Sequence, residues 1–318
     1  MNTAARFWII TSHLNLLLTA IHWNGSGHNI FNACIMLYLA CDSQILIWSE
    51  LDASKAGISM KIVFAQKFEE RYPTNPVESP TRVASTIPEL KEYEFVEPLP
   101  ASLIDIQRVH GKEHIEQVRK KGMFDAASLS AGGAICAAQL AMHKEPAFAL
   151  IRPPGHHASA NRAWGLCFFN NMAIAIRRIR ADTKSGLILK RILIIDIDLH
   201  FGDGTISIFK GDQNTKIVNP WSVDGNFEYL DMDRNGYIKQ VEEACKSFEY
   251  EMVGISAGFD TYIEDWGGLL TNDDFFKIGR IIRNSAEKYC EGRRFSILEG
   301  GYHSDLRYNI KSFIKGFA

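Results

Sequence analysis

The sequence predicts an α/β fold with three layers, α/β/α, built around a mostly parallel central sheet. Four short and almost continuous apolar runs are typical of strands that are buried on both faces of a parallel sheet. Helical segments separate these runs, and strands that alternate with helices form such a sheet. The strands are expected at Ala147–Arg152, Arg191–Ile197, Glu251–Ser256 and Arg294–Leu298, and the helices at Asn171–Arg180, Tyr237–Phe248 and Asp273–Cys290.

Length and composition indicate a soluble globular protein. The chain has 318 residues, of which 46 % are hydrophobic and 23 % charged, and this excludes a disordered, collagen-like or coiled-coil chain. The net charge of −2 means that the chain has no excess of positive charge to attract nucleic acid, so direct nucleic-acid binding is not expected. The six cysteines form no C-x-x-C pair, so we expect reduced, buried thiols in a cytoplasmic protein. Any metal would then be bound by histidines and carboxylates.

The first 59 residues form an apolar extension, because 33 of them are apolar and they include three of the six tryptophans. Two apolar stretches, Phe7–Trp23 and Ile30–Trp48, are interrupted by polar residues, and a membrane helix needs about 20 mostly apolar residues. Three interpretations stay open: an added pair of helices, weak membrane association, or a segment foreign to the native protein. We place the domain boundary at Met60, so that residues 60–318 form the domain that carries every motif described below.

Four further segments lie between Met60 and the first of the four apolar runs. Met60–Phe64 reads as a first strand, and Tyr72–Arg82 is a loop because three prolines and an Asn-Pro dipeptide interrupt regular structure. Ile104–Lys120 has helical spacing. Gly132–His143 is a helix of small residues, of the kind that packs closely on a sheet.

Polar residues follow each of the four apolar runs directly. They form the segments PPGHH (153–157), DIDLHFGDG (196–204), AGFD (257–260) and EGGYH (299–303). The carboxyl ends of parallel strands meet at one edge of the sheet, where α/β proteins bind their ligands. These histidine, aspartate and tyrosine side chains should therefore converge on one crevice, and the glycines among them allow tight turns.

Asp198, His200 and Asp260 are the candidate metal ligands. A single aspartate at a strand end is usually a cap or turn residue, so each signal alone is weak. Asp198 and His200 are two residues apart at a strand exit, which places both side chains on the same side. Three protein ligands leave positions open for water and substrate, as in catalytic zinc sites. We therefore expect one catalytic Zn²⁺.

Five segments occur in a characteristic order and spacing: RPPGHHA (152–158), GLCFFNN (165–171), DIDLHFGDGT (196–205), SAGFD (256–260) and LEGGY (298–302). The chain from Met60 onward resembles the histone deacetylase and acetylpolyamine amidohydrolase family, which has the arginase/deacetylase fold. The first and last segments are more similar to its class II and prokaryotic branches than to class I. The resemblance implies hydrolysis of an N-acyl amide, typically an acetyl group on a primary amine.

The resemblance also implies a role for each matched residue. The zinc ligands match Asp198, His200 and Asp260. The paired histidines that transfer protons, and the carboxylates that orient them, match His156, His157, Asp196 and Asp203. A structural K⁺ is implied as well, bound by carbonyl groups around Asp196, Asp198 and His200.

Other matched positions concern the substrate. Tyr302 matches the hydroxyl donor to the substrate carbonyl, and Gly165 a backbone position that lines the tunnel for the acyl-lysine. Leu166 stands where an aromatic residue often forms one tunnel wall, so the tunnel is expected to be wider. Phe227 is a further candidate for substrate contact. Phe201 stands where many members carry a second histidine. That histidine is not a metal ligand.

Three residues near the expected rim have weaker assignments. The acidic rim residue of some relatives has no secure match, and Asp125 is a loose candidate. His110 and His114 are four residues apart, so they could pair on one helix face, and we interpret them as rim or cap residues.

The chemistry needed for amide hydrolysis agrees with this assignment. Zinc polarises the carbonyl and lowers the pKa of bound water towards about 7. A neutral imidazole removes the water proton, and a histidine pair can also protonate the leaving amine. Tyr302 and the metal would stabilise the oxyanion.

Two alternatives remain: a non-catalytic protein that binds acylated amines, and an arginase-like ureohydrolase with two metals. A two-metal ureohydrolase needs additional carboxylates that bridge the two ions. The positions of these carboxylates are occupied here by Tyr262 and Gly202. Acetyl-lysine in proteins, acetylated polyamines and small acylated amines all present the same amide, so the sequence leaves the substrate open.

Overall fold

The computed structural model describes residues 60–182, 186–221 and 230–318. The expectations for residues 1–59 and for Phe227 lie outside these residues. In the described part, seven parallel strands form one sheet in the order β2-β1-β3-β7-β6-β4-β5. The strands are β1 (Lys61–Val63), β2 (Glu94–Val96), β3 (Ala147–Ala149), β4 (Ile192–Asp196), β5 (Thr215–Val218), β6 (Met252–Ala257) and β7 (Arg294–Leu298). The predicted α/β class is confirmed, and the sheet is parallel throughout.

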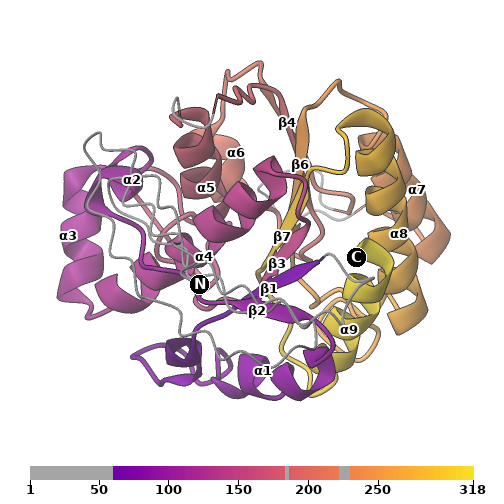
Figure 1. Cartoon of the computed structure of the whole chain (residues 1–318). Coiled ribbons are helices and arrows are strands. Elements are labelled where there is room, and N and C mark those ends of the chain that lie inside the picture. The colour runs from indigo at the N-terminus through magenta and orange to yellow at the C-terminus, as the bar shows by residue number, and fades with distance from the viewer. Residues whose placement is uncertain (1–59, 183–185, 222–229) are drawn as a thin grey trace, which may run out of the picture. The chain divides into compact units, whose positions relative to one another are not determined.

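Helices cover both faces of the sheet, and Figure 1 shows α4 and α5 on one side and α7, α8 and α9 on the other. The α-helices are α1 (Thr81–Ala84), α2 (Leu103–Gln107), α3 (Lys112–Lys120), α4 (Phe124–Met142), α5 (Asn171–Arg180), α6 (Asp203–Ile208), α7 (Arg234–Ala244), α8 (Asn272–Tyr289) and α9 (Leu306–Phe317). Two short 3₁₀ helices, η2 (Gln66–Glu69) and η3 (Ile87–Leu90), precede β2. None of the helices in the described ranges combines the length and apolar character that a membrane span requires.

The central strands end at the same level of the sheet. Asp196 at the end of β4 pairs with Ser256 in β6, and Ala257 at the end of β6 pairs with Leu298 at the end of β7. All residues of β3, β4, β6 and β7 are buried, as the continuous apolar runs predicted. The polar segments that follow these strands therefore emerge together at one edge.

Two strands have no counterpart in the sequence analysis, because they lie at the two edges of the sheet. β2 and β5 are only partly buried, and their sequences EFV and TKIV contain no long apolar run. An edge strand has one side in contact with solvent, so it lacks the pattern that identifies a central strand.

Several predicted boundaries are wrong. The strand expected to reach Arg152 ends at Ala149, and the helix expected at Tyr237–Phe248 lies at Arg234–Ala244. The helix expected at Ile104–Lys120 is broken into α2 and α3, because Gly111 is an extended N-cap with φ −68° and ψ 156°. The helix expected to start at Gly132 begins at Phe124. The loop at Tyr72–Arg82 ends in the first turn of α1.

The small residues of α4 do allow close packing. A Cβ at Gly132 would lie 1.9 Å from the Leu99 carbonyl oxygen, and a Cβ at Gly133 would lie 2.5 Å from the Ile151 side chain. Substitution at either position would push this helix away from its neighbours.

Candidate metal and catalytic site

A pocket of about 670 Å³ opens at the carboxyl edge of the sheet. It contains most of the residues singled out from the sequence, and segments far apart in the chain contribute to its wall. The lining residues used in the argument are His156, His157, Gly165, Leu166, Asp198, His200 and Tyr302.

Asp198, His200 and Asp260 come together as a compact cluster, with ligand atoms that all lie within 4.8 Å of one another. His200 Nδ1 lies 3.1 Å from Asp198 Oδ1 and 3.0 Å from Asp260 Oδ2. β4 ends at Asp196, so strand alternation does not itself bring Asp198 and His200 together. The chain bends after the strand, and the Asp198 carboxylate accepts the backbone N–H of His200 at 2.9 Å.

Backbone groups anchor both carboxylates of the cluster. The N–H of Gly300 donates to Asp198 Oδ2 at 2.8 Å, and the N–H of Leu199 donates to Asp260 Oδ1 at 2.9 Å. Gly300 and Gly258 also leave the space that Asp198 occupies, because a Cβ would lie 2.6 Å and 2.0 Å from Asp198 Oδ2, respectively. The carboxylates are therefore held in place by the loops after three different strands.

The cluster has the features of a cation site. Asp260 Oδ2 is buried and accepts no hydrogen bond of good geometry, although His200 Nδ1 is 3.0 Å away. Burial and the neighbouring charge of Asp198 raise the pKa of Asp260 to about 7. Burial would lower the pKa of His200, but the two carboxylates raise it to about 10. A buried oxygen without a donor, among two carboxylates and an imidazole, fits a divalent metal such as zinc.

The paired histidines are both buried, and each is bonded to a different carboxylate. His156 Nδ1 lies 3.1 Å from Asp196 Oδ2, and His157 Nδ1 lies 2.7 Å from Asp203 Oδ1. The two rings are 4.0 Å apart. This is the pairing of histidines with orienting carboxylates that the resemblance implied.

Their protonation tendencies differ because their surroundings differ. Burial opposes a charge on His156, but Asp198 and Asp196 raise its pKa well above the ordinary range. Burial and the charge on His156 lower the pKa of His157 to about 4. The carboxylates therefore favour a charge on the inner histidine, whereas burial and that neighbouring charge favour the neutral form of the outer one.

Tyr302 has its ring fixed between two side chains. The Trp266 indole stacks on it at 4.4 Å, and the Arg82 guanidinium carbon lies 4.8 Å from the ring centroid. Asp265 Oδ2 accepts the backbone N–H of Tyr302 at 2.6 Å. Burial raises the pKa of Tyr302 well above its usual range, so the phenol remains protonated and can donate a hydrogen bond.

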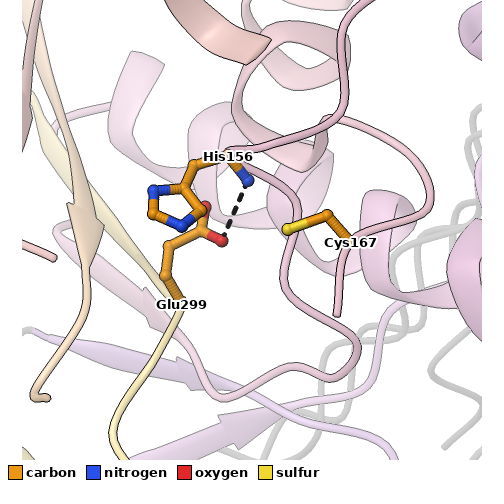
Figure 2. A group of neighbouring side chains, drawn as sticks. All are labelled: His156, Cys167 and Glu299. Carbon is orange, nitrogen blue, oxygen red and sulfur yellow. Dashed lines mark hydrogen bonds between the residues drawn. The ribbon is translucent and has the colours of Figure 1, made fainter. Parts of the chain in front are cut away.

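A second group with metal-binding residue types lies beside the first, and Figure 2 shows its members, His156, Cys167 and Glu299. Here the carboxylate is already occupied by donors. Glu299 Oε2 accepts the backbone N–H groups of Gly155 at 2.7 Å and His156 at 3.2 Å, and Figure 2 marks the latter bond. Ser256 Oγ donates to Glu299 Oε1 at 3.3 Å, so both oxygens of this carboxylate have donors within the protein. Glu299 therefore positions the histidine loop.

Only some of the residues expected to contact the substrate are found at the pocket. Gly165 and Leu166 line the pocket, and a Cβ at Gly165 would lie 3.3 Å from the His157 ring. Phe227 lies outside the described residues. Asp125 is exposed in the first turn of α4 and does not line the pocket.

His110 and His114 are buried, so the interpretation as rim or cap residues is wrong. Their rings are 4.9 Å apart, although α3 starts only after His110. His110 Nε2 accepts the backbone N–H of Asn170 at 2.9 Å, and His114 Nε2 bonds the Phe168 carbonyl at 2.8 Å. The pair therefore supports the segment that forms one wall of the pocket.

Sequence reasoning missed the roles of several residues around the site. Glu299 stands inside the LEGGY segment but has no charge partner near it in the sequence. Arg82 donates to the carbonyls of Glu299 and Gly301 at 2.5 and 2.8 Å, across more than 200 residues. Trp164 contacts both His157 and Asp203. Its position one residue before the GLCFFNN segment was the available signal.

Comparisons with known proteins agree with this site. Residues 119–229 and 231–316 match the histone deacetylase domain family. A probable deacetylase from Archaeoglobus fulgidus is 34 % identical over 295 residues, covering 76 % of this chain and 80 % of the relative. A histone deacetylase-like amidohydrolase from Pseudomonas aeruginosa is 29 % identical over 250 residues, covering 64 % of each chain.

A solved structure shows the same fold. The acetylpolyamine aminohydrolase from Burkholderia pseudomallei superimposes with a TM-score of 0.68 at 22 % identity, covering 81 % of this chain and 98 % of that one. The arginase/deacetylase fold that the resemblance implied is therefore confirmed.

Proposed function

Because the chain belongs to the histone deacetylase family, we propose that it removes an acyl group, typically acetyl, from an amine nitrogen by zinc-dependent hydrolysis. It is an enzyme of the deacetylase and amidohydrolase class. The observation that carries the proposal is the convergence of Asp198, His200 and Asp260 beside two histidine–carboxylate pairs in one pocket. We assign this activity to the domain formed by residues 60–318.

Asp198, His200 and Asp260 would hold the zinc ion, since their facing atoms include a buried oxygen without a donor. When bound there, zinc supplies polarisation of the amide carbonyl and a lowered pKa for water. Three protein ligands leave room for the substrate carbonyl at the pocket side of the cluster. The backbone N–H of Gly300 keeps the Asp198 carboxylate turned toward that side.

The two histidines divide the proton transfers in this proposal. His157 is neutral near pH 7, and Asp203 accepts the bond from its Nδ1, so Nε2 is free to remove a proton from water. Asp196 and Asp198 favour a charge on His156, and in this proposal that charge stabilises the negative charge that develops on the amide oxygen or nucleophile. The proton taken by His157 then passes to the leaving amine.

Tyr302 is the remaining donor to the developing oxyanion. Its ring is clamped between Trp266 and Arg82, so the hydroxyl needs little reorganisation when the carbonyl carbon becomes tetrahedral. Preorganised donors of this kind are usually the largest single contribution to catalysis of acyl transfer.

The proposed substrates are acetylated lysine side chains and acetylated polyamines or small amines. Relatives with deacetylase and acetylpolyamine aminohydrolase names support both classes. Gly165 and Leu166 would contact the acyl-amine stem, because both line the pocket. We also propose a structural K⁺ bound by carbonyl groups around Asp196, Asp198 and His200, and a cytoplasmic location in keeping with the four free cysteines of the described residues.

The test combines metal analysis with a substrate panel on the purified full chain. Metal content per chain is measured, and turnover is assayed on an acetyl-lysine peptide, acetylputrescine, acetylspermidine and longer acyl-lysines. We expect one zinc per chain, loss of turnover after chelation and recovery with added zinc. Full activity in the stripped protein contradicts the zinc assignment. Two divalent metal ions per chain would favour the ureohydrolase, and binding of acylated amines without turnover would favour a sensor.

A further inference from the structure

Trp164 lies at the pocket and contacts the outer histidine–carboxylate pair in two ways. Its indole N–H donates to Asp203 Oδ1 at 3.2 Å and to Oδ2 at 3.0 Å. Its ring also packs against that of His157 in a tilted arrangement, with centroids 3.8 Å apart and planes inclined by 30°. One side chain therefore contacts both the carboxylate and the imidazole.

Asp203 needs an external restraint because it is partly open to solvent. Its side chain is 32 % exposed, whereas that of Asp196, which orients the inner histidine, is 1 % exposed. Among the described residues, His157 and Trp164 are the side chains that hydrogen-bond the Asp203 carboxylate. Without the indole, this carboxylate would be bonded to the imidazole alone and could turn toward water.

The imidazole of His157 depends on the same indole for one of its faces. His156 lies against the ring at 4.0 Å, and Trp164 lies against it at 3.8 Å. The residue that follows is Gly165, which has no side chain to replace the indole. Loss of Trp164 would thus leave one face of the ring uncovered.

We propose that Trp164 is a positioning residue that holds the Asp203 carboxylate, and through it the His157 imidazole, in the orientation that proton removal requires. The proposal rests on the proposed function in one respect, that His157 removes a proton from water. A carboxylate bonded to Nδ1 fixes the tautomer that leaves Nε2 as acceptor. Catalysis is sensitive to displacements of about 1 Å, so a small rotation of this pair lowers turnover.

The kinetic test uses two substitutions that remove different parts of the contact. Trp164→Phe keeps an aromatic face on His157 and loses the N–H, whereas Trp164→Ala loses both. Outer partners of this kind are worth about 10–100-fold, so we expect kcat to fall about 10-fold in W164F and about 100-fold in W164A, with KM within about twofold of wild type. A raised KM at unchanged kcat would instead make Trp164 a substrate-contacting wall and overturn the proposal.

A double-mutant cycle tests whether Trp164 acts through Asp203. In an Asp203→Ala background, Trp164→Phe should change kcat by less than about twofold, because the bond that it removes no longer exists. The same fold loss with and without the carboxylate contradicts the proposal. Trp221→Phe is the matched control, since that indole N–H donates to the Leu230 carbonyl at 3.0 Å and Trp221 does not line the pocket. Its kcat should stay within about twofold of wild type.

A measurement that needs no turnover separates this proposal from the proposed function. In ¹⁵N-histidine NMR of the full chain, His157 should show a slowly exchanging Nδ1–H, identified by its loss in His157→Gln. We expect this signal to exchange faster in W164F and faster still in W164A. An unchanged signal in both variants overturns the role of Trp164. If the wild type hydrolyses no acylated amine, the proposed function fails, and the NMR result still decides on Trp164.

Discussion

Gly258→Ala tests the metal site by the smallest possible change. Gly258 follows β6, and a Cβ there would lie 2.0 Å from Asp198 Oδ2 and 2.4 Å from its Cγ. Contacts of a Cβ below 3.0 Å are essentially never found in proteins. The Asp198 carboxylate therefore has to move by about 1 Å, a displacement that can lower catalysis about 100-fold.

The same movement weakens the anchor of the carboxylate. Asp198 Oδ2 accepts the backbone N–H of Gly300 at 2.8 Å, in a fully buried environment. A hydrogen bond to a charged group contributes about 1.5–3 kcal/mol, and each factor of ten in rate corresponds to about 1.4 kcal/mol. Loss of this bond and an approximately 100-fold loss of kcat/KM are thus the same order of free energy.

The assay compares zinc retained after dialysis against a chelator, kcat/KM and the midpoint of thermal unfolding. Gly236→Ala is the control, because it lies in α7, away from the pocket lining, and its nearest contact is the side chain of Met232 at 3.0 Å. We expect Gly258→Ala to lose zinc and activity while the control keeps both. The double variant Asp198→Gly with Gly258→Ala should regain unfolding stability relative to Gly258→Ala, because the first change removes the Oδ2, Cγ and Cβ atoms of Asp198 that the new Cβ would meet. Wild-type zinc retention and kcat/KM in Gly258→Ala would refute the assignment of Asp198 as a ligand.

Three further predictions concern the hydroxyl donor Tyr302, the buried His110 and the pocket-lining Lys121. Tyr302→Phe should retain zinc and lower kcat by about 10²–10³, the cost of one oxyanion donor. Burial lowers the pKa of His110 from 6.5 to about 3, so between these values the unfolded chain binds a proton at this residue that the folded chain does not. His110 should therefore contribute a fall of about 1.4 kcal/mol per pH unit to the free energy of unfolding below pH 6.5. His110→Phe should remove this contribution from the total slope. Lys121 lines the pocket, where Asp198 is the one carboxylate among the described lining residues. Because acetylspermidine is cationic, Lys121→Glu should lower KM for this substrate about twofold to fivefold. The decrease in KM should be smaller at high salt.

Each of these three has a direct check. An unchanged kcat in Tyr302→Phe would reduce Tyr302 to a packing residue. Denaturant titrations from pH 7 to pH 4 compare the slopes of wild type and His110→Phe, and equal slopes would contradict the contribution of His110. A KM for acetylspermidine that does not respond to Lys121→Glu would show that the polyamine chain does not pass that lysine.

The fold could be predicted from the sequence where burial is complete. β4, β6 and β7 are buried at every residue, and their sequences are almost continuously apolar. The edge strands β2 and β5 are partly exposed and carry no such signal. The break between α2 and α3 was missed because the residues on both sides keep helical spacing. α2 already ends at Gln107, and the extended backbone of Gly111 sets the start of α3.

The candidate site could be predicted in part for a related reason. Residues at the ends of parallel strands meet whatever the details of the loops, and Asp198, His200 and Asp260 do meet. Contacts made by side chains across loops follow no period in the sequence. Trp164 reaches Asp203 over 39 residues and Arg82 reaches Gly301 over 219 residues, so neither role could be deduced without coordinates.

The two neighbouring histidines show how far long-range contacts decide chemistry. His156 and His157 have the same side chain and adjacent positions, yet their pKa values are shifted in opposite directions. The inner ring faces the carboxylates of Asp196 and Asp198, which are delivered by β4 and the bend after it. The outer ring lies between the imidazole of His156 and a neutral indole, with a single, partly exposed carboxylate, that of Asp203. A cation fixed beside a neutral base is what water activation with oxyanion stabilisation requires, so the division of roles arises from the sheet that presents the carboxylates and not from the histidine pair itself.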